Sequence, residues 1–74
     1  MESICEQVEQ GKTSWPELVN EEGECAVKII EKENTLVNTQ IIAEGTFIIQ
    51  IYICDRVLVW VNDKGIVVST PTIG

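Results

Sequence analysis

A long run of strand-forming residues, from Thr46 to Val61, occupies the second half of the chain. Most of its residues are β-branched or aromatic, and these residue types favour extended backbone. Strands usually span about 3–10 residues, so this run is too long to be one strand of a 74-residue domain. We therefore expect residues 46–55 to bend or leave the sheet. The almost wholly apolar segment 57–61 predicts a strand that is covered on both faces, with Trp60 in the core.

The first half of the chain predicts a polar arm and one helix. Residues 1–14 are polar, which indicates an extended or mobile arm, and Pro16 favours extended backbone over residues 15–19. Trp15 is expected in the core. Apolar periodicity over residues 24–34 predicts an amphipathic helix. The residues expected on its buried face are Ala26, Ile29, Ile30 and Glu33.

Two further strands are indicated on either side of the long run. Residues 36–43 predict a strand that ends at Glu44-Gly45, and residues 62–65 (NDKG) predict a reversal, with Gly65 suited to a positive φ. Residues 66–68 then predict a short returning strand.

Composition excludes several classes of function. Twelve acidic and five basic residues give a net charge of −7, which argues against nucleic acid and anionic membranes as partners. No apolar stretch reaches the roughly 18 residues of a membrane-spanning helix. The chain has no histidine, the commonest metal ligand and general base, and it shows no nucleophile–base pair. We therefore expect neither an enzyme nor a metal or cofactor site.

The three cysteines, Cys5, Cys25 and Cys54, allow at most one internal disulfide. A Cys5–Cys54 bridge would close a long loop, which suits a small domain of an oxidising compartment. Three reduced thiols in a cytosolic protein are the alternative, and composition does not decide between the two.

Several motifs occur in order along the chain: KTSWPELV at 12–19, IIEKEN at 29–34, EGT at 44–46, CDRV at 54–57 and GIVV at 65–68. Together with WVN at 60–62 and the closing Pro71, Ile73 and Gly74, they resemble the potato inhibitor I family of serine protease inhibitors. The resemblance runs from Lys12 to Gly74 without a gap in the loop segment. It implies a plant defence protein of the kind produced on wounding.

The resemblance implies an α+β fold, in which one helix packs on a small mixed sheet. Strands 36–43 and 56–61 would run parallel, and residues 44–55 would form an extended, exposed crossover between them. Residues 1–11 would be an N-terminal arm and residues 12–74 a single inhibitor-like domain. The resemblance also implies the Cys5–Cys54 disulfide, and with it a secreted or vacuolar protein.

The resemblance further implies that the exposed loop enters a protease cleft as a substrate would. The scissile bond would be Gln50–Ile51, and Gln50 would fill the primary specificity pocket. Gly45 would open the loop and Arg56 would support it, through Asp55, the C-terminal carboxylate or a loop carbonyl. The other residues expected to contact the protease are Thr46, Phe47, Ile48, Ile49, Tyr52 and Ile53.

The chain also departs from the family pattern. Ile49 stands where the family usually has Thr, Ile51 where it has an acid, and Leu58 where it has the second of two supporting arginines. Because these partners have left together, the fold should survive. Without this polar network, inhibition should be weaker than in members that have it. Gln50 suits neither a trypsin nor a chymotrypsin pocket, which favours subtilisin-like or other tolerant enzymes. The alternative is a non-inhibitory protein that uses residues 46–53 for self-association or another partner.

Overall fold

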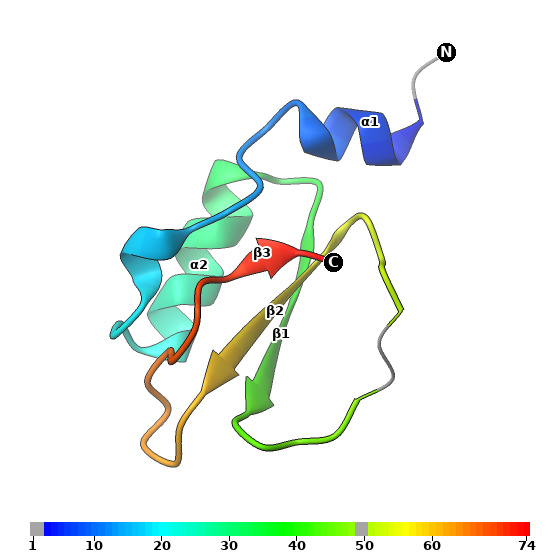
Figure 1. Cartoon of the computed structure of the whole chain (residues 1–74). Coiled ribbons are helices and arrows are strands. Elements are labelled where there is room, and N and C mark those ends of the chain that lie inside the picture. The colour runs from blue at the N-terminus through cyan, green and yellow to red at the C-terminus, as the bar shows by residue number, and fades with distance from the viewer. Residues whose placement is uncertain (1–2, 49–50) are drawn as a thin grey trace.

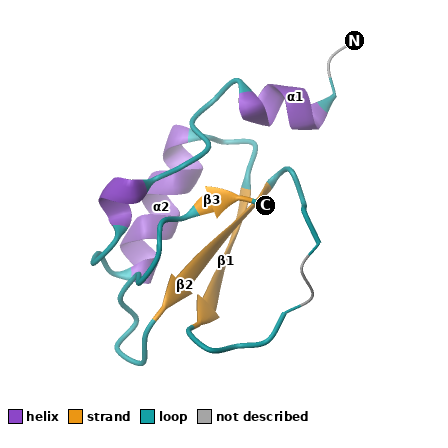
Figure 2. Ribbon diagram, viewed as in Figure 1, coloured by secondary structure: helices purple, strands orange, loops and turns teal. Residues whose placement is uncertain are grey.

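The computed structural model describes residues 3–48 and 51–74, and Figure 1 and Figure 2 show their arrangement. The elements in chain order are α1 (Ile4–Glu9), the 3-10 helix η1 (Pro16–Leu18), α2 (Gly23–Glu33), β1 (Asn38–Ala43), β2 (Arg56–Val61) and β3 (Thr72–Ile73). No helix among these residues is long and apolar enough to cross a membrane.

The strands form one mixed sheet in the order β1-β2-β3, with α2 packed on it. β1 and β2 are parallel, in a register that places Asn38 opposite Arg56 and Ala43 opposite Val61. β3 pairs antiparallel to β2. The α+β fold and the parallel pair with its long crossover are therefore confirmed. The run from residue 46 to 61 does leave the sheet, because β2 begins only at Arg56.

The core lies between α2 and the helix-facing side of β2. Val57, Val59 and Val61 of β2 are buried, whereas Leu58 and Trp60 are only half-buried. Strand side chains alternate between the two faces, so Leu58 and Trp60 point to the side away from α2. The predictions that β2 is covered on both faces and that Trp60 belongs to the core are therefore wrong. Trp15 is fully buried, as expected.

The N-terminal region differs from its prediction. Residues 4–9 form α1 rather than an extended arm, and residues 16–18 form η1 rather than extended backbone. Ser3 caps α1, because its side-chain oxygen accepts a hydrogen bond from the Glu6 amide at 3.2 Å. Proline is well suited to the first position of a helix, which accounts for η1 beginning at Pro16. The division into an arm of residues 1–11 and a domain of residues 12–74 stays a prediction.

Buried contacts fasten α1 to the rest of the molecule. Val8 is fully buried in the core. The side-chain amide nitrogen of Asn34, just after α2, donates to the carbonyl oxygens of Val8 and Lys12, both at 3.1 Å. The Asn34 side-chain oxygen accepts from the Leu36 amide at 3.2 Å. A single buried side chain therefore connects α1, the segment after it and the approach to β1.

The buried face of α2 differs in part from the prediction. Ala26 and Ile30 are fully buried, but Ile29 is 37% exposed and Glu33 is exposed. The third buried residue of α2 is Gly23, which lies against β2. A Cβ atom at this position would lie 2.9 Å from the Cγ1 atom of Val61. The first turn of α2 therefore packs closely against the sheet at Gly23, where a larger residue would not fit.

The reversal at residues 62–65 is confirmed, and Gly65 has a φ of 79°. The Asn62 side-chain oxygen accepts hydrogen bonds from the amides of Lys64 and Ile66 at 2.9 and 3.0 Å. Residues 66–68 do not form the predicted strand. Ile66 and Val67 make isolated bridges, with Glu22 and Val61 respectively.

Candidate functional site

The described residues between β1 and β2, 44–48 and 51–55, trace a wide arc that extends away from the sheet (Figure 1). It opens at Gly45, whose φ of 86° is costly for residues other than glycine. The Thr46 amide closes this turn by donating to the Ala43 carbonyl oxygen at 3.0 Å. Residues 46–48 and 51–53 belong to no strand. These residues therefore have no strand partner within the described part of the chain.

The arc presents large apolar side chains to solvent. Phe47 is 95% exposed, Tyr52 is 63% exposed and Ile51 is 58% exposed. Thr46 and Ile53 are also exposed, and Ile48 is half-buried. The two remaining predicted contact residues, Ile49 and Gln50, lie outside the described residues. The described contact residues thus lie on the two described parts of the arc and are at least partly accessible.

Arg56 joins the arc to the C-terminal segment of the chain. Its Nε atom donates to the main-chain oxygen of Gly74 at 2.7 Å, and its Nη2 atom donates to the Ile51 carbonyl oxygen at 2.8 Å. The Gly74 amide in turn donates to the Arg56 carbonyl oxygen at 2.8 Å. Of the partners suggested by the sequence, a loop carbonyl and a main-chain oxygen of Gly74, the last residue of the sequence, are therefore observed. Asp55 is not among the hydrogen-bond partners of the Arg56 side chain.

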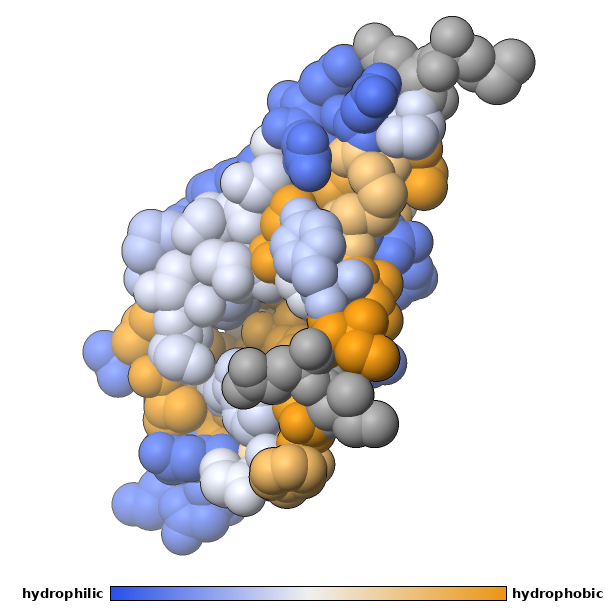
Figure 3. Space-filling model, turned by 45° about the vertical axis from the view of Figure 1, so that its right-hand side comes forward, coloured by the Kyte–Doolittle hydropathy of each residue, from blue (hydrophilic) through white to orange (hydrophobic). Residues whose placement is uncertain are grey.

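A cavity of about 320 Å³ lies between the arc and the sheet. Figure 3 shows a hollow whose floor is hydrophobic beside the residues drawn in grey. The described residues that line the cavity are Ile48, Ile51, Tyr52, Arg56, Leu58, Trp60 and Gly74. Where the family places a second arginine, this chain therefore has an apolar wall formed by Leu58 and Trp60.

Sequence reasoning missed the role of Trp60 and the contact between Tyr52 and Gly74. A Cβ atom on Gly74 would lie 3.6 Å from the Tyr52 ring, so the ring and the C-terminal segment are close neighbours. The alternation of β2 could have identified Trp60, because Arg56, Leu58 and Trp60 share a face when counted in twos. The unbroken apolar run concealed that alternation.

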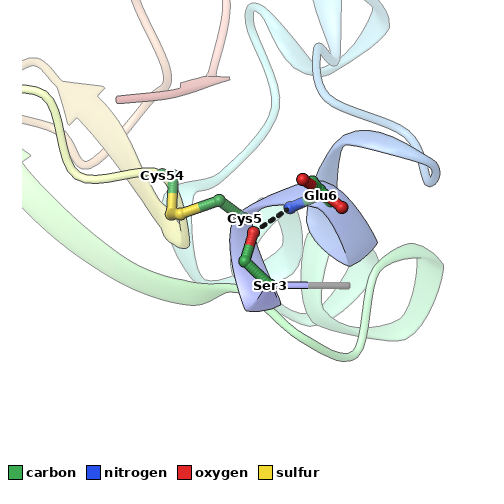
Figure 4. Close-up of a disulfide and its surroundings, with 4 residues drawn as sticks. All are labelled: Ser3, Cys5, Glu6 and Cys54. Atoms are coloured by element: carbon green, nitrogen blue, oxygen red, sulfur yellow. Dashed lines mark hydrogen bonds between the residues drawn. A yellow bond between two sulfur atoms is a disulfide. The ribbon is translucent and has the colours of Figure 1, made fainter. Parts of the chain in front are cut away.

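A disulfide joins Cys5 of α1 to Cys54 at the far end of the arc, with a Cα–Cα distance of 5.4 Å (Figure 4). Cys25 is free and exposed on α2. The predicted pairing is therefore confirmed. Both ends of the arc are fixed, one by β1 and the other by the bridge and Arg56.

Residues 3–48 and 51–74 contain no group of three or more His, Cys, Asp or Glu side chains that could hold a metal ion. The arc itself carries no charged side chain between Glu44 and Asp55. What the site offers is therefore backbone outside any strand, apolar side chains and one supporting arginine.

Several proteins named as protease inhibitors are similar to this chain over most of its length. The "Inhibitor of trypsin and hageman factor" of Cucurbita maxima is 48% identical over 64 residues, which are 86% of this chain and 94% of that protein. The "Glu S.griseus protease inhibitor" of Momordica charantia is 46% identical over 65 residues, 88% of this chain and 96% of that protein. The crystal structure of the bitter gourd trypsin inhibitor superposes with a TM-score of 0.86 at 49% identity, covering 88% and 96% of the two chains.

Residues 6–74 match the family described as the Potato inhibitor I family. The match includes the arc, its supporting Arg56 and Cys54, and it begins one residue after Cys5, the other half of the bridge. With the fold, the disulfide and these relatives in agreement, the chain belongs to the potato inhibitor I family.

Proposed function

We propose that this chain inhibits serine proteases by presenting residues 46–53 to the active-site cleft as an extended, substrate-like strand. The observation that carries the proposal is the exposed arc, fixed at both ends and without a strand partner for residues 46–48 and 51–53. An exposed extended segment adds to the edge of a protease sheet through main-chain hydrogen bonds. Family membership makes the chain a protease inhibitor and not an enzyme.

In this proposal the scissile bond is Gln50–Ile51. Thr46, Phe47, Ile48 and Ile49 contact the enzyme on the amino side of the bond, and Tyr52 and Ile53 contact it on the carboxyl side. Arg56 holds the Ile51 carbonyl oxygen, which lies directly after the scissile bond. Because that oxygen is already fixed, less conformational entropy is lost on binding.

The chemistry of Gln50 indicates the class of target. Its neutral, polar side chain is poorly matched to trypsin, which needs a cation, and to chymotrypsin, which needs an aromatic ring. Subtilisin-like enzymes with tolerant pockets are the proposed targets. Gln also has the shape of Glu, and the Momordica relative is named for a Glu protease, so such an enzyme belongs in the same test.

We also propose that inhibition is weaker than in members that have the full polar network. Arg56 is the one arginine left on this face of β2, and Leu58 replaces the other. Beneath the arc, Leu58 lines a cavity of about 320 Å³ in place of that arginine, and its side chain has no hydrogen-bond donor to offer the arc. A less supported arc loses more conformational freedom when it binds.

The test is a panel of subtilisin, trypsin, chymotrypsin, elastase and the Glu-specific S. griseus protease, titrated with the wild-type chain and with Gln50→Lys and Gln50→Phe. We expect the wild type to inhibit subtilisin or the Glu protease. Each variant should gain about thirtyfold or more against its matched enzyme, trypsin or chymotrypsin, because a pocket-filling residue carries a large part of the binding energy. Folded variants that gain nothing would show that residues 46–53 are not the binding segment.

A second candidate function is self-association through the same arc. Phe47 at 95% and Tyr52 at 63% exposure are unusually accessible for aromatic residues. A seven-residue stretch of high β-propensity without charge or proline, such as residues 47–53, also has the composition of segments that pair with their own copies.

A further inference from the structure

One face of helix α1 is apolar, and only part of this face is covered by the rest of the molecule. Val8 follows Ile4 by four residues and Cys5 by three, so Ile4 and Cys5 both lie on the face of the helix that carries Val8. Val8 is fully buried and Cys5 is bonded to Cys54, so this face is directed toward the body. Ile4 nevertheless remains 48% exposed. The rest of the molecule therefore leaves the start of this apolar face, at Ile4, partly uncovered.

The disulfide brings this exposed isoleucine next to the arc. Ile4 and Ile53 immediately precede Cys5 and Cys54, whose Cα atoms are 5.4 Å apart. Since neighbouring Cα atoms are about 3.8 Å apart, the Cα atoms of Ile4 and Ile53 are at most about 13 Å apart. Ile53 is 40% exposed. Two partly exposed isoleucines thus flank the bridge, and the N-terminal end of α1 extends to the same side as the arc (Figure 1).

The position of Ile4 is fixed before any partner arrives. α1 is held at its first turn by the bridge and at its last by buried Val8, whose carbonyl oxygen accepts from the Asn34 side chain at 3.1 Å. The outward-facing residues of the helix, Glu6, Gln7 and Glu9, are polar and exposed. Because the helix that carries Ile4 is already held in place, less entropy is lost when a partner covers the Ile4 side chain.

We propose that Ile4 and Ile53 form one apolar surface across the Cys5–Cys54 bridge, and that this surface contacts the bound protease beside its cleft, on the carboxyl side of the scissile bond. The occupant is the protease because the surface is continuous with the arc that enters the cleft. This inference rests on the proposed function, and it adds α1 to the inhibitory surface. Ile4 then helps to determine which enzymes are bound, since it contacts enzyme surface outside the cleft.

The experiment measures the inhibition constants of Ile4→Ala and Ile4→Glu against the enzyme of the panel that the wild type inhibits best. Ile29, also helical and 37% exposed, lies on α2 and supplies matched controls, Ile29→Ala and Ile29→Glu. We expect Ile4→Ala to weaken inhibition about threefold and Ile4→Glu about tenfold, because apolar contact is lost and a charge is buried. The Ile29 variants should stay within about twofold. Thiol titration and the melting temperature check that each variant forms the bridge and folds.

A second measurement does not depend on any variant. In the wild-type chain labelled at isoleucine methyl groups, adding the enzyme should shift the Ile4 signals and leave those of Ile29 in place. Inhibition that is unchanged in Ile4→Glu, or Ile4 signals that do not move, would overturn the inference while the proposed function stands. A wild type that inhibits no enzyme of the panel would instead overturn the proposed function, and the inference with it.

Discussion

At the scale of single residues, Asn34 connects more of the molecule than its size suggests. It is only 5% exposed, and its side chain makes hydrogen bonds to main-chain groups of Val8, Lys12 and Leu36. Replacing one partner of a buried hydrogen bond leaves the other without water or protein to bond. Asn34 therefore has a structural role that its place at the end of a helix alone does not indicate.

We expect Asn34→Ala to lower the free energy of unfolding by about 2–4 kcal/mol, since several buried groups lose their partner. Urea denaturation measures the change. The matched variant is Asn38→Ala, at an exposed position, which should cost less than about 0.5 kcal/mol. Similar losses in the two variants would mean that the buried hydrogen bonds of Asn34 contribute little.

Lys12 is the centre of a small cluster of charges. Its ammonium group forms ion pairs with the carboxylates of Glu17 and of Glu33, the latter at 3.2 Å. The hydrogen bond to Glu17 raises the pKa of Lys12 above its usual value, and the same bond lowers the pKa of Glu17. These groups are accessible to solvent, so their contribution to stability is small.

The sign of the expected pH dependence follows from Glu17. A carboxyl whose pKa is lowered by folding stabilises the folded state above its unfolded pKa, and this stability is lost as the pH falls through the folded pKa. We expect an NMR titration to show a higher Glu17 pKa in Lys12→Met than in the wild type. High salt should reduce the difference. If the Glu17 pKa were the same in both proteins, the ion pair would be absent in solution.

At the scale of elements, the bridge between α1 and the end of the arc constrains a long stretch of chain. Cys5 and Cys54 are 49 residues apart in sequence. Closing a loop of this length is worth about 3–5 kcal/mol in the chain-entropy model. The bridge also fixes the first turn of α1, and buried Val8 fixes the last turn of the same helix.

We expect the double variant Cys5→Ser, Cys54→Ser to lose about 3–5 kcal/mol of stability, whereas Cys25→Ser should be nearly neutral because Cys25 is exposed and unbonded. Chemical denaturation under non-reducing conditions compares the three proteins. A large loss in Cys25→Ser together with a small one in the double variant would contradict the assignment of the bridge.

Elements whose apolar residues recur with a clear helical or strand period were predictable from the sequence. Elements that depend on local capping or on contacts made by the whole fold were harder to predict. The helix at Gly23–Glu33 was placed within one residue at each end. α1 was missed, although Ser3 and Glu6 have the spacing of a helix-capping pair and Ile4 and Val8 that of a helical face. Their signal is short, and a helix of six residues needs tertiary contacts to be stable, which here include the core contact of Val8 and the bridge.

The sequence predicted which segment forms the candidate site, but not which residues from other parts of the chain lie against that segment. The family motifs placed the arc and named Arg56, since its residue type and position match. A loop carbonyl was among the partners expected for Arg56, but that Ile51 supplies it, and that the Tyr52 ring lies beside Gly74, depends on parts of the chain that only the folded structure brings together. No pattern in the local sequence encodes such contacts.

At the scale of the whole molecule, the balance between inhibition and self-association depends on what supports the arc. We expect the triple variant Ile49→Thr, Ile51→Asp, Leu58→Arg to inhibit more strongly than the wild type, because it restores the polar partners beneath the arc. It should also associate less, because an apolar segment gains charge. Inhibition assays and sedimentation velocity at increasing concentration measure the two effects.

Two results would count against this expectation. One is a wild type that remains monomeric at high concentration, which would remove the case for self-association. The other is a triple variant that folds but inhibits no better than its parent, which would show that the apolar wall at Leu58 and Trp60 supports the arc as well as the polar network does.

The Cys5–Cys54 bridge also makes residues 5–54 a closed ring, of which the Gln50–Ile51 bond is one link. A protease that cuts this link opens the ring but does not divide the molecule, because Cys5 belongs to one piece and Cys54 to the other. The pairing of β1 with β2 holds the same two pieces a second time. The new ends therefore cannot diffuse apart, and resealing of the bond can compete with departure of the enzyme. A nicked molecule should migrate as a single band in a denaturing gel and separate into two only after reduction.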